Sequence, residues 1–175
     1  MRLEIEFPED RLGVIIGREG EVKRKIEESC KCRIAISKSS ISIECEDSLA
    51  FMKAKNVLLA IARGFSAEVA LKMLENEDLI FESMDLSQLV SDKAMQRIMG
   101  RIIGKDGQMK KQIEELLNVK VSIYEKYVSL IGEYENITIA REALNMIIEG
   151  AQHSTVIKFI ERKRREMKIK SLDWL

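Results

Sequence analysis

The spacing of hydrophobic and polar residues predicts a short series of strands and helices at the start of the chain. Residues 3–7 alternate apolar and charged side chains, which is the period of a strand with one buried face. Pro8 ends this strand. Residues 9–16 predict a short helix, and residues 21–29 predict a second helix with apolar side chains on one face and charged ones elsewhere.

Two more strands and a longer helix complete this first unit. Residues 32–38 and 40–46 alternate apolar and polar side chains around the turn-forming stretch Ser-Lys-Ser-Ser, so they predict an antiparallel pair. Residues 47–63 carry apolar side chains at helical spacing, and Gly64 ends the helix. The predicted order is strand, helix, helix, strand, strand, helix.

The second half of the chain repeats this order. Placing Gly17 on Gly104 brings Gly20 onto Gly107, and the apolar positions of the following helix and strands also coincide. The second unit opens with a strand at residues 79–84, followed by a longer connection to its first helix than in the first unit. An internal repeat of this length predicts two small domains.

We therefore predict an α+β chain in which each domain packs a three-stranded antiparallel sheet on three helices. The predicted domains are residues 1–65 and 78–152. Residues 66–77 predict a helical linker, because they lack the Gly, Ser and Pro enrichment of flexible connections. Residues 153–175 predict an extra C-terminal helix and tail with a strongly basic final half.

Composition excludes several classes of protein. The chain is 46% hydrophobic and 33% charged, with no apolar run long enough to span a bilayer and no signal-peptide pattern at its start. We expect a cytoplasmic protein without a membrane partner. Cys30, Cys32 and Cys45 form an odd set without the spacing of a secreted framework, which indicates a reducing compartment, and we expect buried, apolar thiols.

The sequence gives little support for an enzyme. The one histidine, His153, stands just before the last predicted helix, where a capping or surface role is more common than general-base catalysis. Neither glycine pair is followed by the Lys-Ser or Lys-Thr of a nucleotide-binding loop, and the cysteines have no partners at zinc-ligand spacing. We expect no catalytic residue, no metal, no cofactor and no small-molecule substrate.

The stretches Val-Ile-Ile-Gly-Arg-Glu-Gly, from Val14, and Arg-Ile-Ile-Gly-Lys-Asp-Gly, from Arg101, stand at equivalent places in the two units. One such stretch indicates only a helix end and a tight turn, but its recurrence between two helices resembles the type I KH domain, a module that binds single-stranded nucleic acid. The resemblance covers both units. It implies that the glycine loop clamps about four nucleotides, whose bases face a groove beside the sheet.

Physical reasons support an RNA site at such a loop. Glycine has no Cβ, so the backbone can approach a sugar-phosphate chain, and the unpaired amides at the next helix start suit phosphate oxygens. Each isoleucine of the two pairs, Ile15-Ile16 and Ile102-Ile103, either lines the groove or belongs to the core. The predicted RNA-binding residues are Arg97, Arg101, Ile103, Gly104, Lys105, Asp106, Gly107, Lys110 and Lys111 in the second unit, Ile16, Gly17, Arg18, Glu19 and Gly20 in the first, and Arg162 and Arg165 in the last helix.

The charge distribution favours the second unit as the stronger RNA site. Formal net charge is zero, but residues 92–112 hold six basic and two acidic side chains. In the first unit Glu19 and Glu21 lie beside the loop where the second has Asp106 and a neutral glutamine. Binding should weaken with salt, because it releases counterions. Residues 75–85 are acidic and form either a solvated face or a docking surface for a basic protein.

The tandem pair, the helical linker and the basic last helix more narrowly resemble the archaeal relatives of the ribosome-assembly factor Dim-two, also called partner of Nob one. The resemblance implies binding near the 3′ end of small-subunit rRNA, a role in pre-rRNA processing and small-subunit assembly, and two protein partners: a Nob-type endonuclease and the alpha subunit of translation initiation factor two. The alternatives are a KH protein of messenger RNA or of a degradation complex, and a protein-interaction scaffold with little RNA affinity.

Overall fold

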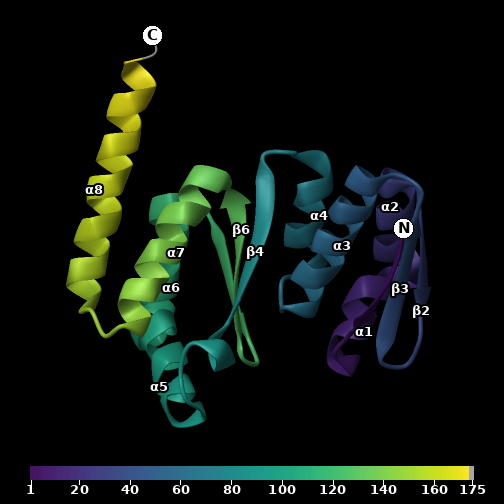
Figure 1. Ribbon diagram of the computed structural model, residues 1–175, viewed down its shortest axis with the longest axis horizontal. Coiled ribbons are helices and arrows are strands. Elements are labelled where there is room, and N and C mark those ends of the chain that lie inside the picture. The colour runs from purple at the N-terminus through teal and green to yellow at the C-terminus, as the bar shows by residue number, and fades with distance from the viewer. Residues whose placement is uncertain (174–175) are drawn as a thin grey trace. The chain divides into compact units, whose positions relative to one another are not determined.

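The computed structural model describes residues 1–173, so the last two residues of the predicted tail, 174–175, lie outside the described residues. The chain divides into two compact units, Met1–Phe81 and Glu82–Leu175, and each is described by itself. Figure 1 shows that each unit combines one sheet with several helices. Within residues 1–173, no helix combines the length and the apolar character needed to cross a membrane.

The first unit has the predicted order of elements. Its elements are β1 (Arg2–Glu6), α1 (Glu9–Ile16), the 3₁₀ turn η1 (Arg18–Gly20), α2 (Glu21–Cys30), β2 (Cys32–Ile36), β3 (Ser40–Cys45), α3 (Ser48–Ala62) and α4 (Ala67–Glu75). The sheet has the order β1-β3-β2, and both pairs are antiparallel. The register pairs Ile5 with Ile41 and Ile34 with Ile43, so the apolar residues gather on one face for the helices to cover.

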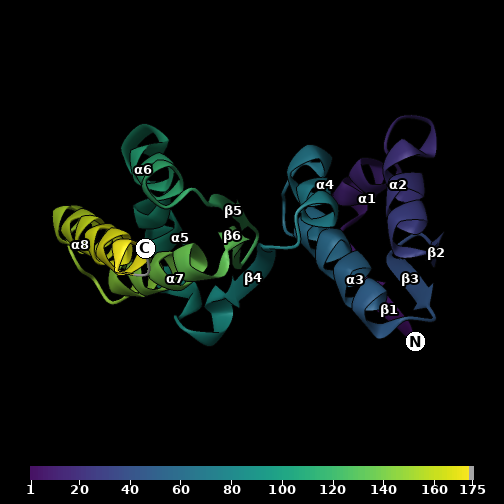
Figure 2. The same cartoon turned by 90° about the horizontal axis from the view of Figure 1, so that it is seen from above.

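The second unit repeats this arrangement, with a longer helix at the place in the chain order that α4 has in the first unit. Its elements are β4 (Leu79–Asp85), η2 (Leu86–Gln88), α5 (Asp92–Ile103), η3 (Lys105–Gly107), α6 (Gln108–Leu117), β5 (Lys120–Tyr124), β6 (Tyr127–Glu133), α7 (Tyr134–Ile148) and α8 (His153–Leu172). The sheet has the order β4-β6-β5. The short turn η2 occupies part of the longer connection predicted before α5. The helix α8 lies against α6 and α7 (Figures 1 and 2).

Equivalent residues of the two units form their cores. Ile26 and Ile113, on the second helix of each unit, are both fully buried, and so are Ile43 in β3 and Leu130 in β6, with exposures of 0% and 1%. The predicted fold class, with two sheet-and-helix domains built to one plan, is confirmed.

The predicted linker helix forms as α4. Ser66 caps it, since its side-chain oxygen accepts a hydrogen bond from the backbone N–H of Val69 at 3.3 Å. The helix packs against α3 and α2 of the first unit, so this segment is ordered. The next element is β4, and the boundary between the two compact units falls within it, after Phe81. The predicted domain boundaries at residues 65, 77 and 152 stay predictions.

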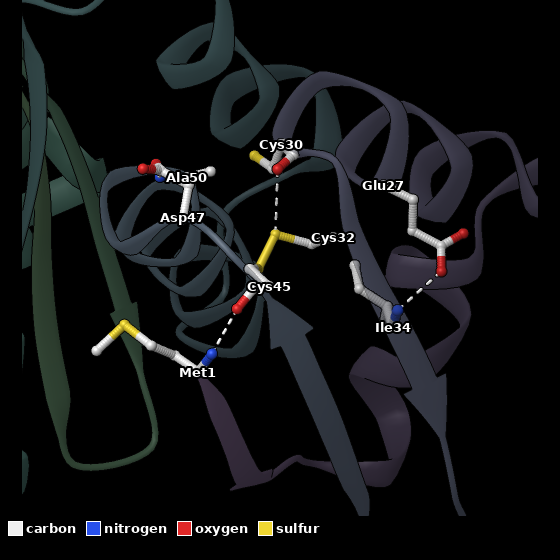
Figure 3. The surroundings of a disulfide bond; sticks show 8 residues. All are labelled: Met1, Glu27, Cys30, Cys32, Ile34, Cys45, Asp47 and Ala50. Atoms are coloured by element: carbon white, nitrogen blue, oxygen red, sulfur yellow. Dashed lines mark hydrogen bonds between the residues drawn. A yellow bond between two sulfur atoms is a disulfide. The ribbon is translucent and has the colours of Figure 1, made fainter.

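The structure corrects the expectation of three unbonded cysteines. Cys32 and Cys45 stand directly opposite each other in the register of β2 and β3, with Cα atoms 4.5 Å apart, and form a disulfide (Figure 3). Cys30 remains a buried free thiol, and burial raises its pKa. The pairing follows from strand register, which the spacing of the cysteines along the sequence does not reveal.

Candidate nucleic-acid interface

The two glycine loops have the same backbone conformation. In each loop the first glycine adopts a positive φ with an extended ψ, the acidic residue is left-handed, and the second glycine is left-handed. The φ angles are 70° and 77° for Gly17 and Gly104, 53° for both Glu19 and Asp106, and 76° and 74° for Gly20 and Gly107. The sequence repeat is therefore also a repeat of a conformation that side chains rarely adopt.

The two glycines of each loop have different roles. A Cβ on Gly104 would lie 2.7 Å from both the backbone nitrogen and the Cβ of Met109 in α6, and one on Gly17 would lie 2.5 Å from a methyl group of Val22. The first glycine therefore allows the loop to pack on the following helix. A Cβ on Gly107 would meet nothing within 4 Å, so the second glycine leaves the backbone open on its outer side, where a nucleotide strand can approach.

Each loop leads directly into a helix start without a side-chain cap. Gly107 precedes Gln108 at the start of α6, and Gly20 precedes Glu21 at the start of α2. A glycine in the capping position offers no side chain to either helix, and the first amides, of Glu21 and Gln108, donate to the backbone carbonyls of Arg18 and Lys105 in the preceding 3₁₀ turns. The absence of a side-chain cap and the positive end of the helix dipole together favour an anion such as a phosphate near these helix starts.

The isoleucine pairs divide between core and surface. Ile15 and Ile102 are fully buried, whereas Ile16 is 41% exposed and Ile103 is 38% exposed. The sequence left both roles open for all four residues. The second isoleucine of each pair is thus an apolar side chain at the surface directly before the loop, where it can contact a base, while the first belongs to the core.

The charges around the loops differ between the units. Residues 92–112 hold six basic and two acidic side chains, whereas the equivalent residues 5–25 hold five of each. At the start of α2, Glu21 pairs with Lys25 at 3.0 Å, and this hydrogen bond and charge lower the pKa of Glu21. The carboxylate stays ionised at neutral pH, directly after the first loop. The second loop therefore has the more favourable charge for phosphate.

The predicted basic residues of the second unit differ in their exposure and in their contacts. Arg97 and Lys105 are exposed. Lys110 and Lys111 each lie one turn before a glutamate of α6, with nitrogen–oxygen distances of 3.5 Å and 3.8 Å. The Lys111 pair is exposed and of a weak type, whereas the Lys110 pair is half-buried. Arg101 differs from the others, because its guanidinium is half-buried and donates to backbone carbonyls at the end of α7.

A second structural role was missed by sequence reasoning. Glu114 and Glu27 each lie within 4 Å of a lysine in their own helix. In addition, Glu114 accepts a hydrogen bond from the backbone N–H of Val121 at 2.9 Å, and Glu27 accepts one from that of Ile34 at 2.8 Å. These carboxylates tie the helix after each loop to the neighbouring strand, and their equivalent spacing in both repeats was the available signal.

The C-terminal helix α8 carries the remaining predicted RNA contacts. Arg162 and Arg165 are exposed, and Arg162 lies 3.9 Å from Glu166 one turn later. Only Val156 and Ile160 of this helix are buried among its described residues. A pocket of about 430 Å³ lies between α7 and the final half of α8. Its lining includes none of the glycine-loop residues, so the candidate interface does not depend on it.

Comparison with known proteins agrees with this geometry. Residues 2–60 match the KH domain family, and residues 80–165 match the second KH domain of PNO1, described as a eukaryotic-type (type I) KH domain. The chain is 36% identical to Dim2p from Pyrococcus horikoshii, superposes on its crystal structure with a TM-score of 0.84, and covers 99% of it with 93% of its own length. The chain belongs to the Dim2/PNO1 family of KH-domain proteins.

Other members of the Dim2/PNO1 family and KH proteins are also similar. A KH domain-containing protein of Methanocaldococcus jannaschii is 38% identical, with 94% of this chain covering 74% of that protein. A chain in the crystal structure of the a/eIF2alpha-aDim2p-rRNA complex from P. horikoshii is 36% identical with a TM-score of 0.85, covering 95% of each chain. The pre-rRNA-processing protein pno1 of Aspergillus oryzae is 30% identical over 70% of this chain, which spans only 48% of that relative.

Proposed function

We propose that this chain binds single-stranded RNA, that its RNA is small-subunit rRNA near the 3′ end, and that it takes part in pre-rRNA processing and small-subunit assembly. Support comes from the family, whose eukaryotic members are named as pre-rRNA-processing proteins, and from the similar chain in a complex with rRNA. The chain spans about half the length of those eukaryotic members, so their complete activity is not assumed.

The observation that carries the proposal is the second glycine loop. Its backbone is open at Gly107, it leads into a helix start without a side-chain cap, and its surroundings hold an excess of basic side chains. A bare loop permits close approach, the amides bind phosphate oxygens, and the cations raise affinity by releasing counterions. Ile103, exposed directly before the loop, supplies an apolar surface for a base.

In this proposal the protein acts by binding and positioning RNA, without catalysing a reaction, and it works in the cytoplasm. The alpha subunit of initiation factor two is the first protein partner to test, because it accompanies the similar Dim2p in the crystallised complex. A Nob-type endonuclease is the second, on the strength of the family resemblance alone.

The proposal is tested by substituting the exposed side of the second loop. The full-length chain with Lys105→Asp and Gly107→Asp is compared with the wild-type chain for binding a labelled single-stranded RNA from the 3′ end of small-subunit rRNA. Aspartate tolerates the left-handed conformation at residue 107 and has open space there. We expect the variant to bind at least about tenfold more weakly, because it removes one cation and adds two anions beside the phosphate path.

The matched control places the same changes in the first loop, as Arg18→Asp with Gly20→Asp. We expect this variant to bind RNA nearly as well as the wild-type chain, since the first loop already lies among equal numbers of acidic and basic residues. Circular dichroism checks that both variants are folded. Unchanged binding by both variants would reject the proposal and favour a protein-interaction scaffold, and a larger loss from the first loop would reverse the ranking of the units.

A further inference from the structure

Arg101 lies in the last turn of α5, close before the glycine that opens the second loop. Its Nη1 donates to the backbone carbonyl of Ile147 at 2.5 Å, and its Nη2 donates to that of Ala151. The carbonyl of Ile147 lies in the last turn of α7, and that of Ala151 lies three residues after the end of this helix. A guanidinium at this place is favourable, because it meets the negative end of the helix dipole and forms charge-assisted hydrogen bonds.

The first unit makes the same connection with a different residue. Arg11 in α1 donates from Nε to the carbonyl of Ile61 at 2.9 Å and from Nη2 to that of Phe65 at 2.5 Å. When the repeats are aligned on their loops, Arg11 does not fall on Arg101. It lies about one helical turn further from its loop.

The carbonyls that the two arginines contact are equivalent. The helices α3 and α7 are each followed, two residues after their last residue, by a glycine with a positive φ, which is 96° for Gly64 and 102° for Gly150. In each case the N–H of this glycine bonds to the carbonyl that the arginine also contacts, of Ile61 or Ile147, at 3.1 Å. The two units therefore share the acceptor pair at the end of their third helix, and each reaches it from its first helix with an arginine at a different position.

Arg11 and Arg101 stand at different positions of the repeat, yet each donates to the equivalent pair of backbone carbonyls in its own unit. This recurrence indicates that the contact is structural and does not serve nucleic-acid binding. Along the sequence, Arg101 lies closer to its glycine loop than Arg11 does to the loop of the first unit. The backbone of Gly104 continues from the same turn, since its N–H bonds to the carbonyl of Gly100 at 2.9 Å. A change in the position of that last turn of α5 would therefore move the loop directly.

We propose that Arg101 is a positioning residue, which holds the last turn of α5 and the Gly104–Gly107 loop against the end of α7 and does not contact RNA phosphate. This revises the sequence prediction that placed Arg101 among the RNA contacts, and it rests on the proposed RNA-binding function. The forked guanidinium is required, because one lysine ammonium cannot donate to both carbonyls with the same fixed geometry.

The test measures the affinity of the full-length chain for the same single-stranded RNA at several salt concentrations. The variants are Arg101→Ala, Arg101→Lys and, as the matched control, Arg11→Ala. We expect both Arg101 variants to bind about tenfold more weakly, a size typical of coupling between separate groups. The slope of log affinity against log salt should stay unchanged, because no phosphate contact is lost. Arg11→Ala loses the equivalent connection in the first unit and should keep wild-type affinity.

Three results would overturn this role. A salt slope reduced by about 0.7 in Arg101→Ala, with normal affinity and slope in Arg101→Lys, would show a direct phosphate contact. Unchanged affinity in both Arg101 variants, with a lower unfolding midpoint, would show a purely structural connection. An equal loss of affinity in Arg11→Ala would show a general effect of destabilisation. Failure of the proposed function appears differently, as unchanged binding by the Lys105→Asp and Gly107→Asp chain.

Discussion

At the scale of single residues, the two glycines of a loop look alike in sequence and differ in structure. Gly104 has no room for a side chain because its backbone packs against Met109, whereas Gly107 faces open space. Both have positive φ angles. The first glycine therefore sets the shape of the loop, and the second sets how closely a ligand can approach.

Substitution by alanine should separate these roles. We expect Gly104→Ala to lower the free energy of unfolding by about 3 kcal/mol, because it adds a clash with α6 to the cost of a positive φ. Gly107→Ala carries only the cost of the positive φ and should lower it by about 1 kcal/mol. Urea unfolding followed by circular dichroism measures both. Equal losses would contradict the different packing of the two glycines.

The sequence predicted some of these residue roles and not others. The glycine loop could be predicted from the repeated stretch, and the basic residues around it from the local count of charges, because neither depends on contacts far away in the sequence. The partition of Ile102 and Ile103 between core and surface depended on the helix orientation. The contacts of Arg101 with Ile147 and Ala151 join positions about fifty residues apart, and no local pattern in the sequence indicates them.

At the scale of secondary-structure elements, strand register decides the chemistry of the cysteines. The alternation of residues 32–38 and 40–46 predicted the β2–β3 pair, but only the register places Cys32 opposite Cys45. The bond closes the end of the hairpin away from its turn, and so it restricts the unfolded chain more than a bond beside the turn would.

The disulfide should stabilise the first unit by about 3 kcal/mol, as expected for a loop of this length. The chain with Cys32→Ser and Cys45→Ser should unfold at lower urea concentration than the oxidised wild-type chain. Added dithiothreitol should destabilise only the wild type. Thiol titration of the denatured protein without reductant should detect Cys30 alone. Three reactive thiols under those conditions would contradict the bond.

Asp85, the last residue of β4, makes the stability of the fold depend on pH. Asp85 accepts hydrogen bonds from the backbone N–H and the hydroxyl of Ser87 and lies 3.1 Å from the Lys126 ammonium. The hydrogen bonds from Ser87 first, and then Lys126, lower the pKa of Asp85. A lowered folded-state pKa contributes stability above the unfolded value of about 3.9, and this contribution is lost as the pH falls through the folded-state pKa.

We therefore expect the wild-type chain to lose more stability on acidification below about pH 4 than the Asp85→Asn chain, which cannot titrate at this position. Urea midpoints at a series of pH values measure the difference. The two chains should have parallel profiles above this range. Parallel profiles throughout the acid range would show that the carboxylate at Asp85 contributes nothing to the pH dependence.

At the scale of the whole molecule, one domain plan occurs twice with different electrostatics. The loops share their backbone angles, the cores share their positions, and Glu27 and Glu114 make the same tie to a strand. The balance of charge around the loops is what distinguishes the units, with an excess of basic residues only in the second. Duplication explains the shared geometry, and the unequal charges favour RNA binding by the second unit.

The central claim, that RNA lies against the open backbone of the second glycine loop, is tested most directly by backbone amide NMR during titration with the single-stranded RNA. We predict that the amide signals of Lys105, Asp106, Gly107 and the first turn of α6 shift most, and that those of Arg18, Glu19 and Gly20 shift less. Shifts confined to other surfaces, with the signals of both loops unchanged at saturation, would contradict the account.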